Sequence, residues 1–386
     1  MCPVWSRRAD AAEAAIVGRH LRRLWAMPGT RLGVVAWPAV RRERVFLSWH
    51  YWWQAHLLDC AVDAYHREHT PERRRRMAHL ARGHRIRNLS GWTNRYYDDM
   101  AWLGLALERA QRGAPFGRRH AVDILANQVF DAWDPGRGGG IPWRRGSDFF
   151  NAPSNGPAAI LLARTGKVWR AEAMADWIDA NLRDRRSNLV LDGVRPNGDL
   201  DRAIYTYCQG VVLGVETELA VRTGAERHRH RVHRLVAAVD HHLASSGVIR
   251  GGGGGDGGLF SGILARYLAF VATVLPGESE ADVRARGTAA AIVLGSADAA
   301  WRHRLQVEEL PLFGHDWSKQ ARLPGLGEGI ASFTGGSVRS SDIPERDLSV
   351  QLSGWMLMEA AHSVASAGFS AGSRRSDDSG RFSDAD

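Results

Sequence analysis

The chain has 386 residues, of which 44% are hydrophobic, so it is long enough to bury a large core and is not a disordered polypeptide. Its 51 basic and 42 acidic residues give a net charge of +9, and the basic residues are arginines except for Lys167 and Lys319, which indicates a coding bias more than a phosphate-binding surface. Cys2, Cys60 and Cys208 lack the paired spacing of a zinc or redox site, and no stretch approaches the roughly 20 apolar residues of a membrane helix. We therefore expect no metal, no cofactor and no integral membrane segment.

Apolar residues recur at helical spacing (i, i+3, i+4 and i+7) along most of the chain, whereas two-residue alternation is scarce. The clearest apolar stripe, from Val232 to Leu243, lies opposite a strongly basic face. The spacing predicts helices at residues 10–26, 50–67, 72–86, 96–112, 118–131, 151–165, 168–182, 205–223, 227–246, 258–275, 281–297 and 346–365.

These helices predict an all-α protein built from six helical hairpins. A ring of hairpins would bury one face of every helix and leave loops at one end to form a cleft. The glycine-rich runs Gly136–Gly140 and Gly251–Gly258 fall between predicted helices, where backbone freedom suits loops near a substrate. We assign residues 1–364 to a single domain and predict that residues 365–386, which are rich in Ser, Gly, Arg and Asp, form a disordered tail.

Two basic clusters, Arg73–Arg76 and Arg227–Arg234, allow an alternative in which the protein binds nucleic acid or an anionic membrane surface. A charge run on a helix is usually a solvated face. We therefore expect no nucleic-acid partner, and we expect a monomer.

The segment from Tyr96 to Trp102 places two adjacent acids, Asp98 and Asp99, among aromatic side chains. Apolar surroundings raise a carboxyl pKa, and a second carboxylate raises one member of a pair further. Such a pair divides into an ionised nucleophile and a protonated acid. Adjacent residues suit the separation of about 5–5.5 Å in retaining glycosidases better than the roughly 6.5–9.5 Å of inverting ones. The alternative is that one of the two acids caps a helix that begins near Met100.

The string YYDDMAW resembles the paired-aspartate motif of glycoside hydrolase family 76, the endo-α-1,6-mannanases. The resemblance spans roughly residues 45 to 275, and the chain departs from the family pattern at Leu103, Pro142 and Cys208. Further segments resemble family motifs in the same order: Trp52-Trp53 with Asp59, Gly139-Gly140-Ile141-Pro142-Trp143, Asn151-Ala152-Pro153-Ser154-Asn155-Gly156, Leu191-Asp192-Gly193, Tyr205-Thr206-Tyr207-Cys208-Gln209-Gly210 and Phe260 to Tyr267.

The resemblance implies an (α/α)6 barrel that cleaves α-1,6-linked mannose backbones with retention of configuration and without a metal. It implies that Asp98 is the nucleophile and Asp99 the general acid/base. The expected partner is an α-mannan polysaccharide or a mannose-containing glycolipid or oligosaccharide. For the substrate site we predict stacking by Tyr97, Trp102 and Trp143 and hydrogen bonds from Asn151, Asn155, Tyr207 and Gln209.

Other functions remain open from the sequence. A non-catalytic glycan-binding protein would keep the aromatic cleft without turnover, and a helical-barrel epimerase would rely on histidines in place of paired acids. For each tryptophan the alternative role is core packing, since the chain has 15 of them. The N-terminus shows no apolar run before a cleavage site, so we expect a cytoplasmic location, although related glycosidases commonly act outside cells and export is not excluded.

Overall fold

The computed structural model describes residues 3–114, 117–325 and 329–370. Helices dominate this part of the chain. They are α1 (Pro3–Arg19), α2 (Arg41–Arg44), α3 (Tyr51–Arg67), α4 (Pro71–Arg87), α5 (Tyr97–Gly113), α6 (Arg119–Asp131), α7 (Ala152–Arg164), α8 (Val168–Asn181), α9 (Thr206–Thr223), α10 (Glu226–Leu243), α11 (Phe260–Val274), α12 (Glu280–Arg302) and α13 (Leu348–Ser366).

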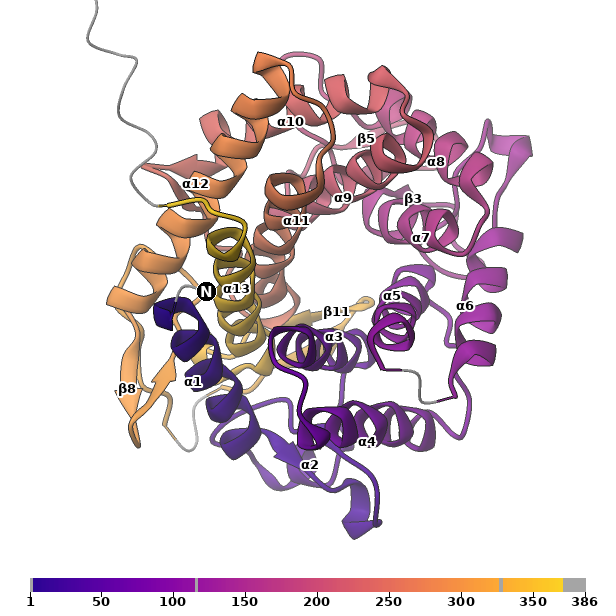
Figure 1. Cartoon of the computed structure of the whole chain (residues 1–386). Coiled ribbons are helices and arrows are strands. Elements are labelled where there is room, and N and C mark those ends of the chain that lie inside the picture. The colour runs from indigo at the N-terminus through magenta and orange to yellow at the C-terminus, as the bar shows by residue number, and fades with distance from the viewer. Residues whose placement is uncertain (1–2, 115–116, 326–328, 371–386) are drawn as a thin grey trace, which may run out of the picture.

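The long helices form two concentric rings, seen along the barrel axis in Figure 1. The inner ring follows the order α3, α5, α7, α9, α11 and α13, and it closes because α13 packs against α3. Each inner helix is backed by an outer helix: α4, α6, α8, α10, α12 and α1 respectively. The sixth pair is unusual, since it joins the first and the last helix of the described chain. The structure confirms the predicted (α/α)6 barrel.

Residue patterns explain which helices lie inside. On α10 the buried apolar residues Val232, Leu235, Val236 and Val239 form one stripe, as expected for an outer helix with one face in solvent. The inner helices α9 and α11 are buried on most of their surface, as expected for helices that are apolar nearly all round.

Short antiparallel strands and single turns of 3-10 helix connect the helices. Three strands form one sheet in the order β3 (Phe150–Asn151), β4 (Gly193–Val194) and β5 (Leu200–Asp201). The other strands form pairs: β1 (Leu21–Arg22) with β2 (Leu32–Gly33), β6 (Ala244–Ser245) with β7 (Val248–Ile249), β8 (Leu305–Val307) with β9 (Leu310–Leu312), and β10 (Ser332–Thr334) with β11 (Ser337–Arg339). The 3-10 turns are η1 (Leu24–Ala26), η2 (Pro135–Arg137), η3 (Gly255–Leu259) and η4 (Pro344–Arg346).

The predicted boundaries need correction at both ends of the described chain. The first helix spans Pro3–Arg19, not residues 10–26, because Leu21 pairs with Gly33 and because Trp25 and Ala26 adopt left-handed backbone conformations. The last helix extends to Ser366, beyond the predicted start of the tail at residue 365, and Phe369 still packs against the core. The rest of the predicted tail, residues 371–386, lies outside the described residues.

One helical segment of the described chain, Gly255–Val274, is long and apolar enough to cross a membrane, contrary to the expectation from the sequence. Two thirds of its most apolar window, 67%, is buried inside the barrel. The segment comprises η3 and the inner helix α11.

Candidate active site

A cleft of about 580 Å³ lies at the end of the barrel where the inner helices begin. It is lined by residues at or just before the first turns of α3, α5, α7, α9 and α11, together with the β10–β11 hairpin. Helix N-termini carry partial positive charge, so this end of the barrel favours carboxylates. The acids in the cleft are Asp98, Asp99, Asp192 and Asp256, and the aromatic residues are Tyr51, Trp52, Tyr96, Trp102, Trp143, Phe149, Tyr205, Tyr207, Phe260 and Phe333.

The paired aspartates occupy the first turn of α5. Tyr96 is the N-cap residue in an extended conformation, and its N–H donates to Asn94 Oδ1 at 2.9 Å. The helix therefore begins at Tyr97, earlier than the Met100 of the capping alternative, and neither aspartate is the cap residue. Both carboxyls line the cleft.

The two carboxyls receive different hydrogen bonds. Asp98 accepts from the Asp99 backbone N–H at 2.8 Å and from the Trp143 indole N–H at 3.1 Å. Asp99 accepts from the Asn94 side-chain amide at 2.5 Å. Asp98 thus has two donors within the described part of the chain, which favours the negative charge on Asp98 over Asp99.

Burial raises the pKa of both acids. It raises the pKa of Asp98 to about 7, although the hydrogen bonds from Asp99 and Trp143 oppose the rise. Burial also raises the pKa of Asp99 well above its usual value, the charge of Asp98 raises it further, and the Asn94 amide offsets part of this. The pair is therefore suited to carry one proton near neutral pH, held on Asp99.

The segment from Pro142 to Phe150 fixes the position of Trp143. The Trp143 carbonyl accepts from Tyr97 N–H at 3.0 Å, and the Trp143 N–H donates to the Phe149 carbonyl at 2.8 Å. Tyr96 pairs with Arg144, and Pro142 pairs with Phe150. The backbone thus brings the indole to the start of α5, as the prediction that Trp143 lies in the site requires.

A third acid, Asp256, supports one wall of the cleft and was missed in the sequence. It lies in η3 and accepts the indole N–H groups of Trp52 and Trp53, both at 2.9 Å, and the Val338 N–H at 2.7 Å. Burial raises its pKa to about 6. Only glycine fits beside it at position 257, where a Cβ atom would lie 2.1 Å from the Gly252 carbonyl oxygen. The glycine run was predicted to form a loop near a substrate, but Asp256 within it was not predicted as a site residue.

A fourth acid, Asp192, lines the cleft from the turn before β4. Burial, together with the charge of the nearby Asp201, raises its pKa to about 7. The Cys208 thiol points at its carboxyl, with a sulfur-to-oxygen distance of 3.8 Å. The sequence motif contained this residue, but its place in the site was not predicted.

The predicted substrate-binding residues divide into two groups. Trp102, Trp143, Asn151 and Tyr207 line the cleft. Asn151 is also the N-cap of α7, where its Oδ1 accepts from Ser154 N–H at 3.2 Å. The Tyr207 ring stacks on Phe260 with a centroid separation of 3.9 Å.

Tyr97, Asn155 and Gln209 are not among the residues that line the cleft. Tyr97 is the first helical residue and packs against the core, whereas the cap residue Tyr96 faces the cleft. The Asn155 amide is fully buried and bonds to the backbone of Ile141 and Asn151. The Gln209 amide is equally buried and bonds to the backbone of Val190 and Tyr205. Both amides position loops.

The β10–β11 hairpin closes the cleft from the C-terminal part of the chain, and Figure 1 shows it reaching toward the barrel axis. The tip of the hairpin lies against Trp143 and Tyr96. A Cβ on Gly336 would lie 2.5 Å from the Trp143 ring and 3.2 Å from the Tyr96 hydroxyl. Gly336 also has a φ of +99°, which favours glycine. Phe333 of β10 lines the cleft with 61% of its surface exposed.

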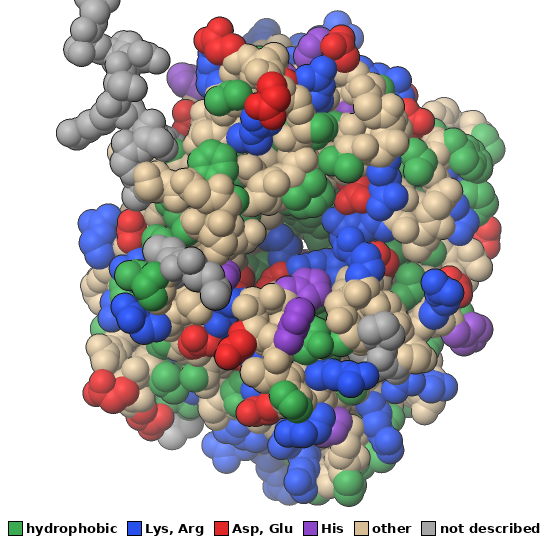
Figure 2. All heavy atoms as spheres, viewed as in Figure 1, with side chains coloured by type: hydrophobic (Ala, Val, Ile, Leu, Met, Phe, Trp, Pro, Cys, Tyr) green, Lys and Arg blue, Asp and Glu red, His purple; other side chains and the backbone are tan. Residues whose placement is uncertain are grey.

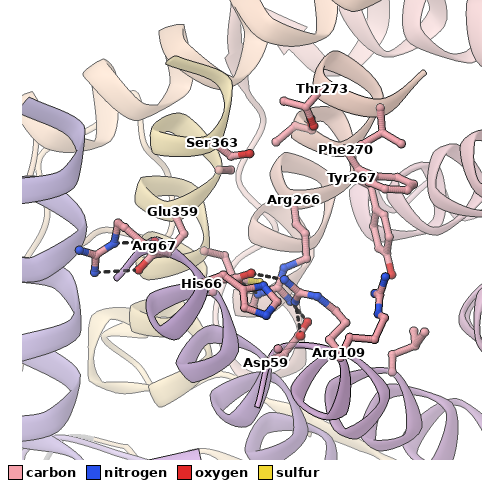
Figure 3. Close-up of a pocket in the computed structure, with 18 of the residues that line it drawn as sticks. Asp59, His66, Arg67, Arg109, Arg266, Tyr267, Phe270, Thr273, Glu359 and Ser363 are labelled. Carbon is pink, nitrogen blue, oxygen red and sulfur yellow. Dashed lines mark hydrogen bonds and ion pairs between the residues drawn. The ribbon is translucent and has the colours of Figure 1, made fainter. Parts of the chain in front are cut away.

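A larger hollow of about 850 Å³ opens at the opposite end of the barrel (Figure 3). Its charged groups bind one another. Asp59 and Asp63 both pair with Arg109 and with Arg266, and this set is called the ion quartet below. Burial alone would raise the pKa of Asp59, but the two guanidinium groups outweigh it and lower that pKa.

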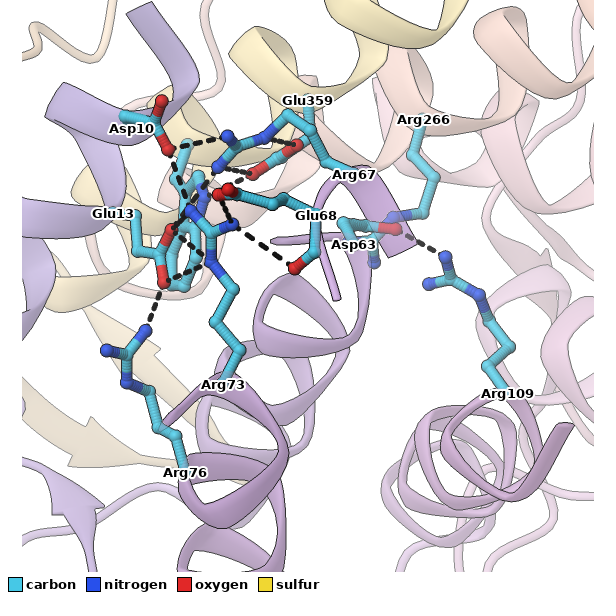
Figure 4. A network of polar contacts seen from close by, with 11 residues as sticks. Asp10, Glu13, Asp63, Arg67, Glu68, Arg73, Arg76, Arg109, Arg266 and Glu359 are labelled. Carbon is cyan, nitrogen blue, oxygen red and sulfur yellow. Dashed lines mark hydrogen bonds and ion pairs between the residues drawn. The ribbon is translucent and has the colours of Figure 1, made fainter. Parts of the chain in front are cut away.

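A second ion network adjoins the quartet and joins α1, α3, α4 and α13 (Figure 4). Arg67 binds Glu359 and Asp10, and Arg73 binds Glu13 and Asp10. These groups connect α1, the first helix of the described chain, with α13, the last one. The network is structural, and the cleft with Asp98 and Asp99 is the candidate active site.

No group of three or more His, Cys, Asp or Glu side chains in residues 3–114, 117–325 and 329–370 is arranged to hold a metal ion. The expectation that the protein uses no cofactor stays a prediction.

Comparisons with known proteins agree with the fold. A protein of Candida glabrata, mannan endo-1,6-alpha-mannosidase DCW1, is 28% identical over 226 residues, which are 50% of this chain and 50% of that relative. The structure of the alpha-1,6-mannanase GH76A from Salegentibacter sp. HEL1_6 matches with a TM-score of 0.78 and 27% identity, covering 93% of this chain and 99% of that one.

An inactive variant of the Salegentibacter enzyme, in which two consecutive aspartates are replaced by asparagine, is in complex with alpha-1,6-mannotriose, and it matches this chain with a TM-score of 0.77. The model of the family described as Glycosyl hydrolase family 76 matches residues 8–343. This match covers most of the sequence and includes every residue that lines the cleft. The chain therefore belongs to glycosyl hydrolase family 76.

Proposed function

We propose that the protein is a retaining glycosidase that cleaves α-1,6-linked mannan by double displacement. The observation that carries this proposal is the pair Asp98 and Asp99, which share one cleft but receive unequal hydrogen bonds. Retaining glycosidases need one ionised and one protonated carboxyl beside the same glycosidic bond. Similarity to the Salegentibacter mannanase supports the substrate class.

In the first step the Asp98 carboxylate attacks the anomeric carbon, and the bond to the leaving oxygen breaks as Asp99 donates its proton to that oxygen. The product of this step is a mannosyl ester of Asp98. In the second step Asp99, now ionised, takes a proton from water while the water oxygen attacks the anomeric carbon and releases Asp98. Two inversions give net retention.

The rest of the cleft supplies the contacts that a sugar requires. Trp102, Trp143 and Phe333 offer aromatic faces, and Asn151, Asp192 and Tyr207 offer polar groups around them. A cleft with apolar walls and a few convergent polar groups is the usual form of a small-molecule or glycan site.

The test is hydrolysis of α-1,6-mannotetraose by the wild-type protein and by Asp98→Asn and Asp99→Asn. We expect each substitution to lower kcat by at least 1,000-fold, since each removes a group that acts in both steps. The control is Asp123→Asn on the exposed side of α6, which removes a carboxyl outside the cleft and should retain full activity. Full activity in both cleft variants would reject the proposal.

Azide distinguishes the roles of the two acids when an activated α-mannoside is the substrate. In Asp98→Ala, azide should replace the missing nucleophile and give the β-mannosyl azide. In Asp99→Ala, azide should attack the mannosyl-enzyme and give the α-mannosyl azide. The opposite assignment of products would exchange the two roles. Binding of mannotetraose without turnover, unchanged in the asparagine variants, would instead identify a non-catalytic glycan-binding protein.

A further inference from the structure

Exposed apolar residues gather at one corner of the molecule. This corner, called the loop corner below, consists of residues 22–31, residues 41–47, residues 89–90 and the outer face of α4. The exposed fractions are 53% for Trp25, 42% for Val45, 71% for Leu47 and 93% for Leu89. Singly exposed apolar residues are common on soluble proteins, but a cluster of large ones marks an interaction surface.

Five residues of these loops, among them the exposed Trp25 and Leu89, adopt backbone conformations that L-residues rarely adopt. The φ angles are +47° at Trp25, +60° at Ala26, +59° at Phe46, +52° at Leu89 and +63° at Ser90. Left-handed backbone at non-glycine residues costs of order 1–3 kcal/mol each and tends to occur at functional sites. Three separate loops therefore carry the same type of strain at one corner.

Specific contacts tie two of these loops to each other and to the end of α4, which continues into residues 89–90. The Trp25 indole donates to the Val45 carbonyl at 2.9 Å. Arg87, the last residue of α4, donates to the Phe46 carbonyl at 2.8 Å and to the Leu47 carbonyl at 3.3 Å. Its guanidinium group also lies 5.9 Å from the centre of the Trp25 ring. The loop corner is thus one built surface.

The same corner is strongly basic. Glu43 is the one acid among residues 21–50, and it is 2% exposed and paired with Arg346. Residues 73–97 contain no acid. Figure 2 shows Lys and Arg side chains gathered along the edge formed by α2 and α4. The exposed arginines of the loop corner are Arg22, Arg23, Arg41, Arg42, Arg44, Arg75, Arg82 and Arg85.

Four guanidinium groups of the loop corner lie near one histidine of α4. Burial lowers the pKa of His79, and the charges of Arg31, Arg75, Arg82 and Arg23 lower it further. The Arg31 N–H donates to the His79 carbonyl at 3.0 Å, which holds this loop against the helix.

The basic run of α10 is different. Arg227 pairs with Glu172, Arg231 with Asp176, and Arg234 with Asp179. Acids of the neighbouring helix α8 therefore neutralise that run, whereas the loop corner faces solvent with positive charge.

The loop corner leads directly into the cleft. Residues 45–47 precede His50, Tyr51 and Trp52, which line the cleft, and residues 89–90 precede Asn94, which binds Asp99. The Tyr51 hydroxyl donates to the Trp92 carbonyl, so the two loops also meet at the cleft wall. Residues 41–47 and 89–90 thus lie at the cleft end of the barrel, whereas Arg75 lies near the turn between α3 and α4 at the other end.

We propose that the loop corner docks the protein onto the surface of an anionic lipid bilayer. Trp25, Leu47 and Leu89 would enter the interfacial region, where tryptophan and exposed leucine side chains are stable, while the arginines pair with lipid phosphates. Apolar residues that protrude between arginines match a bilayer surface, which offers both hydrocarbon and negative charge. Docking itself does not depend on the proposed function. Its consequence, that lipid-linked mannose chains reach the cleft, rests on that function.

The experiment measures co-sedimentation of the full chain with vesicles of phosphatidylcholine, alone or mixed with phosphatidylglycerol. We expect binding to the mixed vesicles, little binding to phosphatidylcholine alone, and weakening as salt rises. Replacing Arg23, Arg75 and Arg82 together with glutamine should weaken binding by about 100-fold, since each arginine near an anionic surface contributes roughly one factor of five. Leu47→Ser with Leu89→Ser should weaken binding by at least 10-fold.

Matched controls remove the same chemistry elsewhere. Val283 and Leu323 are 51% and 57% exposed and lie outside the corner, so their replacement by serine should leave vesicle binding unchanged. The control for the triple arginine variant replaces three other exposed arginines with glutamine, which removes the same charge: Arg185, Arg186 and Arg302. Hydrolysis of soluble mannotetraose, measured on every variant, reports on the proposed function separately.

Three outcomes would overturn the docking proposal. One is an absence of binding to anionic vesicles, and another is an equal loss in the control variants. The third is binding to polyuridylate as tight as to vesicles with no effect of the leucine substitutions, which would identify a general polyanion site.

Discussion

Asp98 and Asp99 are neighbours in the chain and share one cleft, yet the hydrogen bonds around them differ. The Asp99 N–H and the Trp143 indole both stabilise an ionised Asp98. Burial opposes ionisation of both acids, and the charge of Asp98 opposes that of Asp99. Because the groups interact strongly, the pair titrates as a unit, and its activity requires the state that carries one proton.

The indole of Trp143 should set the acidic limb of the pH profile. At pH values below this limb both acids are protonated, so Asp98 cannot attack the anomeric carbon. Trp143→Phe removes a donor to the ionised form, so the pKa of Asp98 should rise above about 7. We expect the acidic limb of kcat/KM to move upward by roughly one pH unit. The measurement is a pH series with mannotetraose, and an unmoved limb would show that the indole does not control the proton.

Asp256→Asn provides the contrast. The charge of Asp256 raises the pKa of Asp98, so its removal should move the same limb to lower pH. Both variants alter the cleft wall and are expected to raise KM, but the limb should move in opposite directions. A shift in the same direction would indicate general disturbance of the cleft.

At the scale of elements, buried amides fix the loops that shape the cleft. Gln209 of α9 bonds to both backbone groups of Val190 at 2.7 and 2.8 Å. We predict that Gln209→Ala lowers the free energy of unfolding by roughly 2–3 kcal/mol, because buried backbone groups of Val190 lose their partner. Urea unfolding measures this change. At a temperature where the variant is folded, KM should change less than 3-fold, whereas a large rise in KM would restore Gln209 as a substrate ligand.

The sequence was sufficient to predict the helices and the barrel, because helical periodicity records which face of each helix is buried. It was also sufficient to predict six of the residues that line the cleft: Asp98, Asp99, Trp102, Trp143, Asn151 and Tyr207. It did not separate Tyr96 from Tyr97, since the first helical residue decides which ring faces the cleft. Asp256 and the β10–β11 hairpin were missed because their contact at Val338 joins positions 82 residues apart.

On the scale of the whole molecule, the two ends of the barrel differ in how their charges are used. At the cleft, three acids lie near helix N-termini: Asp98, Asp99 and Asp256. None of the hydrogen bonds described for them comes from an arginine. Away from the cleft, Arg109 and Arg266 bind the acids of the ion quartet. The acids near the helix N-termini at the cleft are the ones that complement the helix dipoles.

The ion quartet should stabilise the barrel only while it is complete. Arg266→Met leaves Asp59 and Asp63 with one arginine fewer in a site where the four side chains are at most 19% exposed. We predict a loss of about 3–5 kcal/mol in the free energy of unfolding, measured with urea at neutral pH. The control is Arg284→Met, whose ion pair with Glu280 is exposed and should contribute little. Equal stability of the two variants would contradict the prediction.

Acid should weaken the same quartet. The folded-state pKa of Asp59 is lower than its ordinary value, so the unfolded chain binds the proton more readily. The contribution of Asp59 is therefore present above the ordinary aspartate pKa and is lost as pH falls through its lowered folded value.

The pairing of α1 with α13 has a consequence for how the protein is made. Among the helices of the barrel, the ribosome makes α1 first and α13 last, so the apolar stripe of α1 (Trp5, Ala9, Ala12 and Ile16) lacks its partner until the other barrel helices have been made. The nascent barrel stays open at one position until the final helix emerges, and Arg67 meets Glu359 only then. Chaperones that hold exposed apolar helices should bind the growing chain, and premature termination before α13 should send it to proteolysis.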